Sequence, residues 1–241
     1  MKNKNFLFLQ YNKIDWQIQE KTKINSKIDE FIIDSILSKK KGSSIKIFDI
    51  GFGIGFFMKL VLHKLKNSYE RIIIHGCEPS EKNYEYFTKK PLQIGKGIEV
   101  KTFDNPFLKT KTNENFDFVT AVYVFPHFIS DDLDKTAEKI KSMLEPKGKF
   151  ILVVANEDYL ERKLKSRPDL LVKKETIKFN NKKYQQIWHY SEIPQAGKVL
   201  NCDRETSLYS NLFEKSGFEL ILKQNLNHNN HICTVFVFQK K

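Results

Sequence analysis

The chain of 241 residues is 40% hydrophobic and 29% charged, so it can bury a core of domain size, and this composition argues against global disorder. Its formal net charge of +12 is compatible with an acidic partner such as RNA or a membrane surface. The lysines are scattered and arginine is scarce, however, which favours a general lysine bias over a nucleic-acid site. No stretch approaches the roughly 20 apolar residues of a membrane span, and the apolar run near the start is too short for a secretory signal.

The three cysteines, Cys77, Cys202 and Cys233, lie far apart and form no C-x-x-C pair. Neither a zinc site nor a redox dithiol is therefore predicted, and no other metal site is expected. Small core residues in a reducing compartment are the simplest interpretation, so we predict a cytoplasmic protein.

An N-terminal helical cap is expected over residues 1–42. Its first part is polar with a few aromatic side chains, of which Tyr11 and Trp16 are candidate substrate contacts. A helix begins near Ser26, which forms a capping-box pattern with Asp29, and it ends in a run of lysines followed by glycine.

A strand, a glycine turn and a helix follow one another over residues 46–60. The turn carries Gly51, Gly53 and Gly55, so a ligand can approach its backbone closely, and the first N–H groups of the helix point across it. Asp49 stands two residues before the first glycine, where a negative charge is unfavourable for a pyrophosphate and suits a ligand with a cationic end. An ordinary glycine turn without a ligand is the alternative.

The spacing Asp49-x-Gly51-x-Gly53-x-Gly55 resembles the first motif of class I S-adenosylmethionine (SAM) methyltransferases. This resemblance implies SAM as cofactor and S-adenosylhomocysteine as its product. It also implies that the glycine turn lies under the amino-acid part of SAM, while Asp49 orients the ammonium group directly or by fixing the loop.

A second buried strand, residues 71–77, ends at Glu78 and Pro79. An acid at the tip of the second strand is well placed to accept hydrogen bonds from a ribose diol. The pattern resembles the acidic second motif of the same enzymes, so both residues are assigned to the cofactor site. A solvated loop glutamate is the alternative.

The third strand, residues 98–102, is followed by Phe103 and Asp104. The family resemblance implies that Asp104 takes the exocyclic amine of the adenine while Phe103 packs on the ring. The Asp-Asn-Pro sequence that begins at residue 104 is equally typical of a turn.

The fourth strand, residues 116–122, runs into Tyr123 and then His127. This segment resembles the part after the fourth strand in small-molecule methyltransferases, where a histidine often follows a short apolar turn. We assign Tyr123 to the cofactor site and His127 as the first candidate for a general base; a histidine that caps the loop or packs beneath the next helix is the alternative. The absence of an Asn-Pro-Pro-Tyr/Phe motif here argues against enzymes that methylate the amino groups of DNA adenine and of some protein glutamines, and the absence of Pro-Cys argues against cytosine C5 methylation.

A helix with an amphipathic repeat and a fifth strand, residues 150–155, complete a predicted cofactor-binding core of residues 43–155. An insertion over residues 156–203 follows, with a helix and two short strands around Asn180. It carries Trp188, His189 and Tyr190 together. The insertion is expected to form a lid or substrate wall with Trp188 and Tyr190 as substrate contacts and His189 as a second candidate base; a stabilising flap is the alternative.

The last part, residues 204–241, is predicted to hold a helix capped by Asp203 and two strands, residues 218–224 and 231–238. Six residues cannot form a crossover helix, so these strands must be antiparallel if they pair. The fold class is therefore α/β, a Rossmann-like three-layer sandwich with a seven-stranded, mostly parallel sheet and an inserted hairpin. The family resemblance implies the strand order 3-2-1-4-5-7-6.

Together these features predict a SAM-dependent methyltransferase that acts on an oxygen or nitrogen nucleophile, with a small molecule as the expected partner. An RNA or protein methyltransferase that uses the basic surface is one alternative. A non-catalytic nucleotide-binding protein on the same fold is another. The sequence does not determine the oligomeric state.

Overall fold

A computed structural model of the protein describes residues 10, 26–37, 43–90, 92, 95–193, 197–228 and 231–241. Its principal helices and strands are α3 (Ser26–Leu37), β1 (Ser44–Ile50), α4 (Phe56–Leu65), β2 (Arg71–Cys77), α5 (Glu81–Lys89), β3 (Ile98–Phe103), β4 (Phe116–Val122), α6 (Leu133–Met143), β5 (Leu144–Ala155), α7 (Glu157–Ser166), β6 (Leu171–Phe179), β7 (Lys182–Ile193), β8 (Gly197–Arg204), α8 (Thr206–Lys215), β9 (Phe218–His228) and β10 (His231–Lys240). Short 3₁₀ turns include η3 (Phe125–His127), η4 (Ser130–Asp132) and η5 (Pro168–Leu170).

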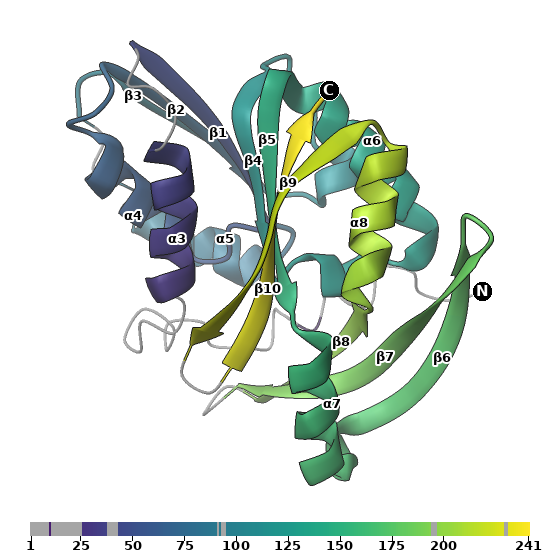
Figure 1. Ribbon diagram of the computed structural model, residues 1–241. Coiled ribbons are helices and arrows are strands. Elements are labelled where there is room, and N and C mark those ends of the chain that lie inside the picture. The colour runs from purple at the N-terminus through teal and green to yellow at the C-terminus, as the bar shows by residue number, and fades with distance from the viewer. Residues whose placement is uncertain are drawn as a thin grey trace.

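The central sheet has seven strands in the order β3-β2-β1-β4-β5-β10-β9 (Figure 1). Strands β1 to β5 pair in parallel, whereas β10 is antiparallel to both β5 and β9. Strands β9 and β10 are longer than predicted, and only residues 229–230 separate them, which leaves no room for a crossover. The predicted fold class and strand order are confirmed.

Helices cover both faces of the sheet, so the central strands are buried on both of their faces (Figure 1). Apolar side chains of α3, α4 and α5 pack on one face, together with Ile47 of β1. Side chains of α6 and α8 pack on the other face, together with Phe48. Because successive strand residues point to opposite faces, β1 contributes to both cores, and its carboxyl end is held in a fixed position.

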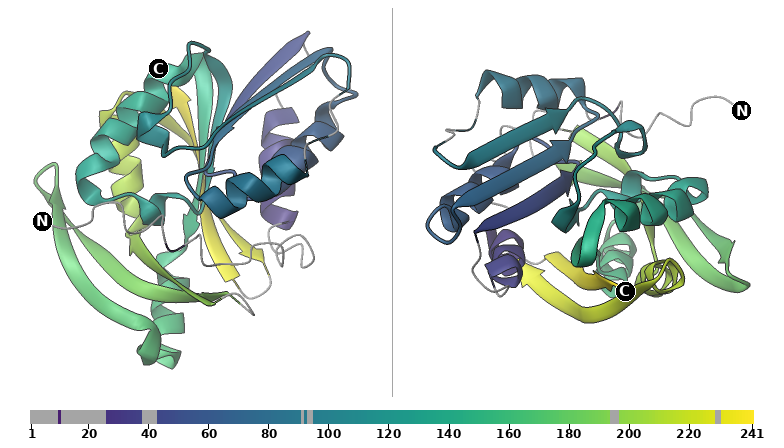
Figure 2. Two further views of the ribbon diagram at one scale, coloured as in Figure 1. Left: turned by 180° about the vertical axis from the view of Figure 1, so that it is seen from behind. Right: turned by 90° about the horizontal axis from the view of Figure 1, so that it is seen from above.

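A second sheet, here called the lid sheet, has three antiparallel strands in the order β6-β7-β8 and lies beside the carboxyl edge of the central sheet (Figures 1 and 2). The sequence predicted only two of these strands. Residues 197–204 form the third, and Asp203 pairs with Ile187 of β7. The prediction that Asp203 caps the next helix is therefore wrong: Glu205 is the residue before α8, and it makes no side-chain cap.

Buried Arg204 connects the lid sheet to the loop after β4. Its guanidinium donates five hydrogen bonds, to Gln186 Oε1 (2.9 Å), Phe125 O (3.2 Å), Cys202 O (3.1 Å), Phe128 O (2.7 Å) and Ser130 Oγ (3.3 Å). Three of these acceptors belong to η3, η4 or the turn between them. The lid sheet and the loop after β4 do not pair as strands. The five N–H donors of the planar guanidinium therefore supply the hydrogen bonds between them.

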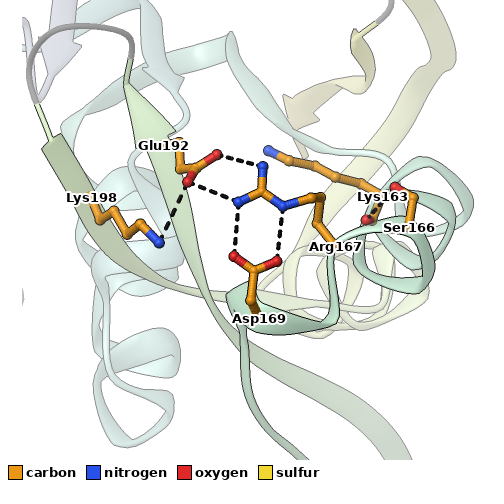
Figure 3. Close-up of polar contacts among 6 residues, drawn as sticks. All are labelled: Lys163, Ser166, Arg167, Asp169, Glu192 and Lys198. Atoms are coloured by element: carbon orange, nitrogen blue, oxygen red, sulfur yellow. Dashed lines mark hydrogen bonds and ion pairs between the residues drawn. The ribbon is translucent and has the colours of Figure 1, made fainter.

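An exposed arginine makes a comparable set of contacts at the far end of the lid sheet (Figure 3). Arg167 forms bidentate contacts with Asp169 (2.8 Å) and with Glu192 (3.0 Å), and Lys198 lies 3.4 Å from Glu192. All four side chains are accessible to solvent, so screening leaves little net stabilisation.

The three cysteines are buried and free, which confirms their prediction as core residues. Within the described ranges, no helix is both long and apolar enough to cross a bilayer. The same residues contain no group of three or more His, Cys, Asp or Glu side chains arranged to hold a metal ion.

The two arginines allow a matched comparison. We expect Arg204→Met to lower the free energy of unfolding by about 2–4 kcal/mol, because it leaves buried carbonyl groups without donors. Arg167→Met removes an exposed network and should lower it by less than about 1 kcal/mol. Urea unfolding of both variants measures the difference, and equal effects would contradict the role given to Arg204.

Candidate functional site

The glycine turn between β1 and α4 has all three glycines at positive φ, between 57° and 78°. A Cβ at Gly51 would lie 2.7 Å from Val124, and one at Gly55 would lie 2.3 Å from the Phe87 ring, so packing requires both glycines. A Cβ at Gly53 would meet no atom within 4 Å. The turn therefore leaves open space above Gly53, where a ligand can lie against the backbone.

Asp49 lies at the carboxyl end of β1 and is buried. Its Oδ1 accepts a hydrogen bond of 2.7 Å from Thr120 Oγ1 on the neighbouring strand β4. Burial raises the pKa of Asp49 to about 7, against the lowering effect of this hydrogen bond, and the nearby Glu78 carboxylate raises it further. Thr120 thus fixes the orientation of a carboxylate that has been taken out of water.

Glu78 follows β2 and is also buried. Its two oxygens accept hydrogen bonds of 2.8 Å from the backbone N–H groups of Gly53 and Ser80. Burial raises its pKa to about 7, against these hydrogen bonds. The alternative of a solvated loop glutamate is therefore wrong, because Glu78 is buried and holds the glycine turn, with the Asn83 side chain as a further hydrogen-bond partner.

A third buried carboxylate, Asp29, comes from the first turn of α3. Asp29 is only 3% exposed, and its Oδ2 accepts no hydrogen bond from the described residues. Burial raises its pKa to about 7, with added repulsion from Asp49 and Glu30. Asp29 lies close enough to Asp49, at the carboxyl end of β1, for their charges to interact.

Asp29, Asp49 and Glu78 thus form a cluster, here called the carboxylate cluster, around the open glycine turn. Among the described residues, no lysine, arginine or histidine pairs with any of them. The N–H groups at Gly53 and Ser80 are engaged by a protein carboxylate, so a phosphate would meet negative charge at this point. The site is complementary to a cationic, phosphate-free ligand.

Other predicted cofactor contacts lie along the same edge. Pro79 is half-buried between Glu78 and the start of α5. Phe103 is paired with Cys77, and its ring stacks on Phe48 at 6.4 Å between centroids, so the ring belongs to the core on the α6 face. Asp104, one residue beyond β3, is exposed and available to a ligand.

Tyr123 and His127 lie after β4, as predicted. Tyr123 has a φ of 57°, and its ring contacts the ring of His231 at 5.4 Å between centroids. His127 is buried in η3, between the carbonyl groups of Phe125 and Phe128 that Arg204 binds. Burial lowers the pKa of His127 to about 4, so the imidazole is neutral at pH 7.

His189 of β7 forms a buried pair with Asp203 of β8. Nε2 of the ring lies 2.7 Å from Asp203 Oδ2, while Nδ1 of the ring and Oδ1 of the carboxylate have no hydrogen-bond partner among the described residues. Burial raises the pKa of Tyr123 and lowers that of His127, and Asp203 acts electrostatically on both groups, so Asp203 lies near the end of β4. Sequence reasoning missed Asp203 as a site residue, because its partner is 14 positions away on another strand.

The predicted substrate contacts are not brought together with His189. Trp188 and Tyr190 alternate with it along β7 and therefore point to the opposite side of the lid sheet. The indole N–H of Trp188 donates to Glu175 Oε1 at 2.6 Å, and Tyr190 is 38% exposed. Tyr11 and Trp16 lie outside the described residues.

The carboxylate cluster gives stability a defined pH dependence. Its three carboxyl groups have ordinary pKa values of 3.8 or 4.5 and a pKa of about 7 in the folded protein. Between these values the folded state holds protons that the unfolded state has lost, so the free energy of unfolding falls as pH rises. His127 acts in the opposite direction, since its pKa falls from 6.5 to about 4, but it is one group against three.

We therefore expect Asp49→Asn to flatten the decrease of the thermal midpoint between about pH 5 and about pH 7.5, because it removes one of the three titrations. Asp34→Asn, an exposed change on α3, serves as the control. Thermal unfolding of the ligand-free proteins measures both slopes. An unchanged slope in Asp49→Asn would show that this carboxyl titrates alike in the folded and unfolded states.

Comparison with solved structures shows that several methyltransferases share this fold. Magnesium protoporphyrin IX methyltransferase from Synechocystis PCC 6803, with bound S-adenosylhomocysteine, is 11% identical, with a TM-score of 0.64 over 95% of this chain and 88% of that chain. The N-methyltransferase NodS from Bradyrhizobium japonicum WM9, also with S-adenosylhomocysteine, is 12% identical, with a TM-score of 0.60 over 93% and 91%. A SAM-dependent methyltransferase from Clostridium acetobutylicum ATCC 824 is 12% identical, with a TM-score of 0.55 over 88% and 90%.

At sequence identities of 11–12%, the similarity to these solved structures concerns the fold alone. The sequence has no match among the curated proteins with which it was compared. It does match the family described as "Methyltransferase domain" over residues 19–223, which is most of the chain. The chain therefore belongs to the methyltransferase domain family.

Proposed function

We propose that the protein is a SAM-dependent methyltransferase that transfers a methyl group to an oxygen or nitrogen nucleophile of a small molecule. The observation that carries the proposal is the carboxylate cluster around the open turn at Gly53, within a chain of the methyltransferase domain family. Buried acids without a basic partner among the described residues suit a ligand that is cationic at neutral pH. A dinucleotide would instead bring phosphates to the same N–H groups.

The residues along the edge fit this cofactor in order. The open space at Gly53 admits the ligand against the backbone, Asp49 would orient its ammonium group, Glu78 would accept from the ribose hydroxyls, and Asp104 would accept from the adenine amine. When bound, SAM supplies an activated methyl group on a sulfonium. The remaining task of the protein is to position the acceptor, exclude water and accept a proton.

The acceptor is proposed to bind between the end of β4 and the lid sheet. His189 and Asp203 each have a buried polar atom without a hydrogen-bond partner among the described residues, and Arg204 holds the lid sheet against the loop that carries His127. Of the two histidines, His189 is the better supported base. Asp203 fixes the orientation of its ring and can stabilise the positive charge that the ring gains, whereas His127, with a pKa of about 4, is a weak base.

Solved relatives by fold act on different acceptors, including a magnesium porphyrin and a glycopeptide nitrogen. The choice of a small-molecule acceptor here is supported by the lid sheet, which stands beside the end of β4. The lysines are scattered along the sequence, which gives less support to RNA as the methyl acceptor. An RNA methyltransferase would show affinity for its acceptor that falls steeply with salt.

The cofactor proposal is tested by titrating the protein with S-adenosylhomocysteine in a calorimeter. We expect micromolar binding, and Glu78→Ala should weaken it by about 1–3 kcal/mol, because the ribose hydroxyls lose their acceptor. Glu85→Ala, an exposed change on α5, should leave the affinity unaltered. Absence of binding to the unmodified protein would refute the proposal, and an unaltered affinity in Glu78→Ala would refute the ribose assignment.

The base is tested by His189→Gln and His127→Gln. In an assay of S-adenosylhomocysteine release with an acceptor drawn from a panel of phenols, amines and carboxylates, His189→Gln should lower kcat by about 10²–10⁴. Its affinity for S-adenosylhomocysteine should be retained. His127→Gln should lower kcat less. A larger loss in His127→Gln would assign the base to that residue, as first predicted from the sequence.

A further inference from the structure

The position of Asp29 is set by its neighbours on α3. The side chains of Ile28, Ile32, Ile33 and Ile36 are almost fully buried and pack in the core on the α3 face. Apolar packing against α4 therefore decides where the helix lies, and with it the position of the Asp29 carboxylate near Asp49 at the end of β1.

This placement is unfavourable in the ligand-free protein. Asp29 Oδ2 is buried and accepts no hydrogen bond from the described residues, and the charged groups acting on Asp29 are two acids, Asp49 and Glu30. An acid near the N-terminus of α3 interacts favourably with the helix dipole, but this interaction does not require burial. Exposed Glu30 can make it equally well. This interaction does not account for a carboxylate buried beside Asp49.

We propose that Asp29 is a second anionic contact for the α-amino group of SAM, so that α3 closes the amino-acid end of the cofactor site. This inference rests on the proposed function. An ammonium group has three N–H donors and can bind the carboxylates of Asp29 and Asp49 together. Within the cluster, the charges of Asp49 and Asp29 interact, as do those of Asp49 and Glu78.

Two probes separate the ammonium group from the rest of the cofactor. S-adenosylhomocysteine carries the amino acid, whereas 5′-methylthioadenosine keeps the adenosine and the thioether and lacks it. We expect Asp29→Asn to weaken the binding of S-adenosylhomocysteine roughly ten- to hundredfold, as for loss of a charged hydrogen bond, and to leave that of 5′-methylthioadenosine unchanged. Asp34→Asn, on the exposed side of the same helix, should change neither.

The thermal midpoint of ligand-free Asp29→Asn provides a second readout. It should equal or exceed that of the unmodified protein, because the substitution removes repulsion within the carboxylate cluster. Equal affinity of Asp29→Asn and the unmodified protein for S-adenosylhomocysteine would overturn the inference. So would an equal loss of both ligands together with a lower thermal midpoint, which would assign Asp29 a structural role. If the unmodified protein fails to bind S-adenosylhomocysteine, the proposed function fails instead.

Discussion

The site depends on the hydrogen bond between the Gly53 N–H and the Glu78 carboxylate. This contact joins the turn after β1 to the loop after β2, and a second bond to the Ser80 N–H fixes the same carboxylate at the start of α5. A buried acid therefore occupies the helix-start position at which nucleotide folds commonly bind phosphate. With Asp49 and Asp29 beside it, the protein places three buried carboxyl groups at the ligand site, and their raised pKa values express the free-energy cost of ionising them there.

The second half of the site depends on Arg204. This one buried side chain joins two strands of the lid sheet to the turns after β4, and so it sets the distance between the two histidines and the edge of the central sheet. The two candidate bases are consequently in different surroundings. His127 is buried in η3, and burial keeps its imidazole neutral at pH 7, whereas His189 has a carboxylate partner. A difference in surroundings of this kind is how two identical side chains acquire different roles.

Much of the architecture could be predicted because its causes are local. Buried strands of about six residues, a glycine turn at Gly51 to Gly55 and a connection too short for a crossover helix are visible in neighbouring residues, and together they predict the mixed sheet. The prediction went wrong where a long-range pairing decided the outcome. Residues 197–204 form a strand because β7 supplies hydrogen bonds to them, and Asp203 leaves its expected capping role for the same reason.

The sequence by itself determined the strands of the central sheet and the helices between them, the glycine turn and the positions of Asp49 and Glu78 at strand ends, because periodicity, turn chemistry and loop length act over a few residues. Only the tertiary structure decided that Asp29 is buried beside Asp49, that Glu78 binds the turn it was expected to stand beside, and that His189 has a partner in Asp203. The physical reason is that burial and charge pairing depend on which segments the completed sheet brings together. The local sequence around each residue does not indicate which distant residues will become its neighbours.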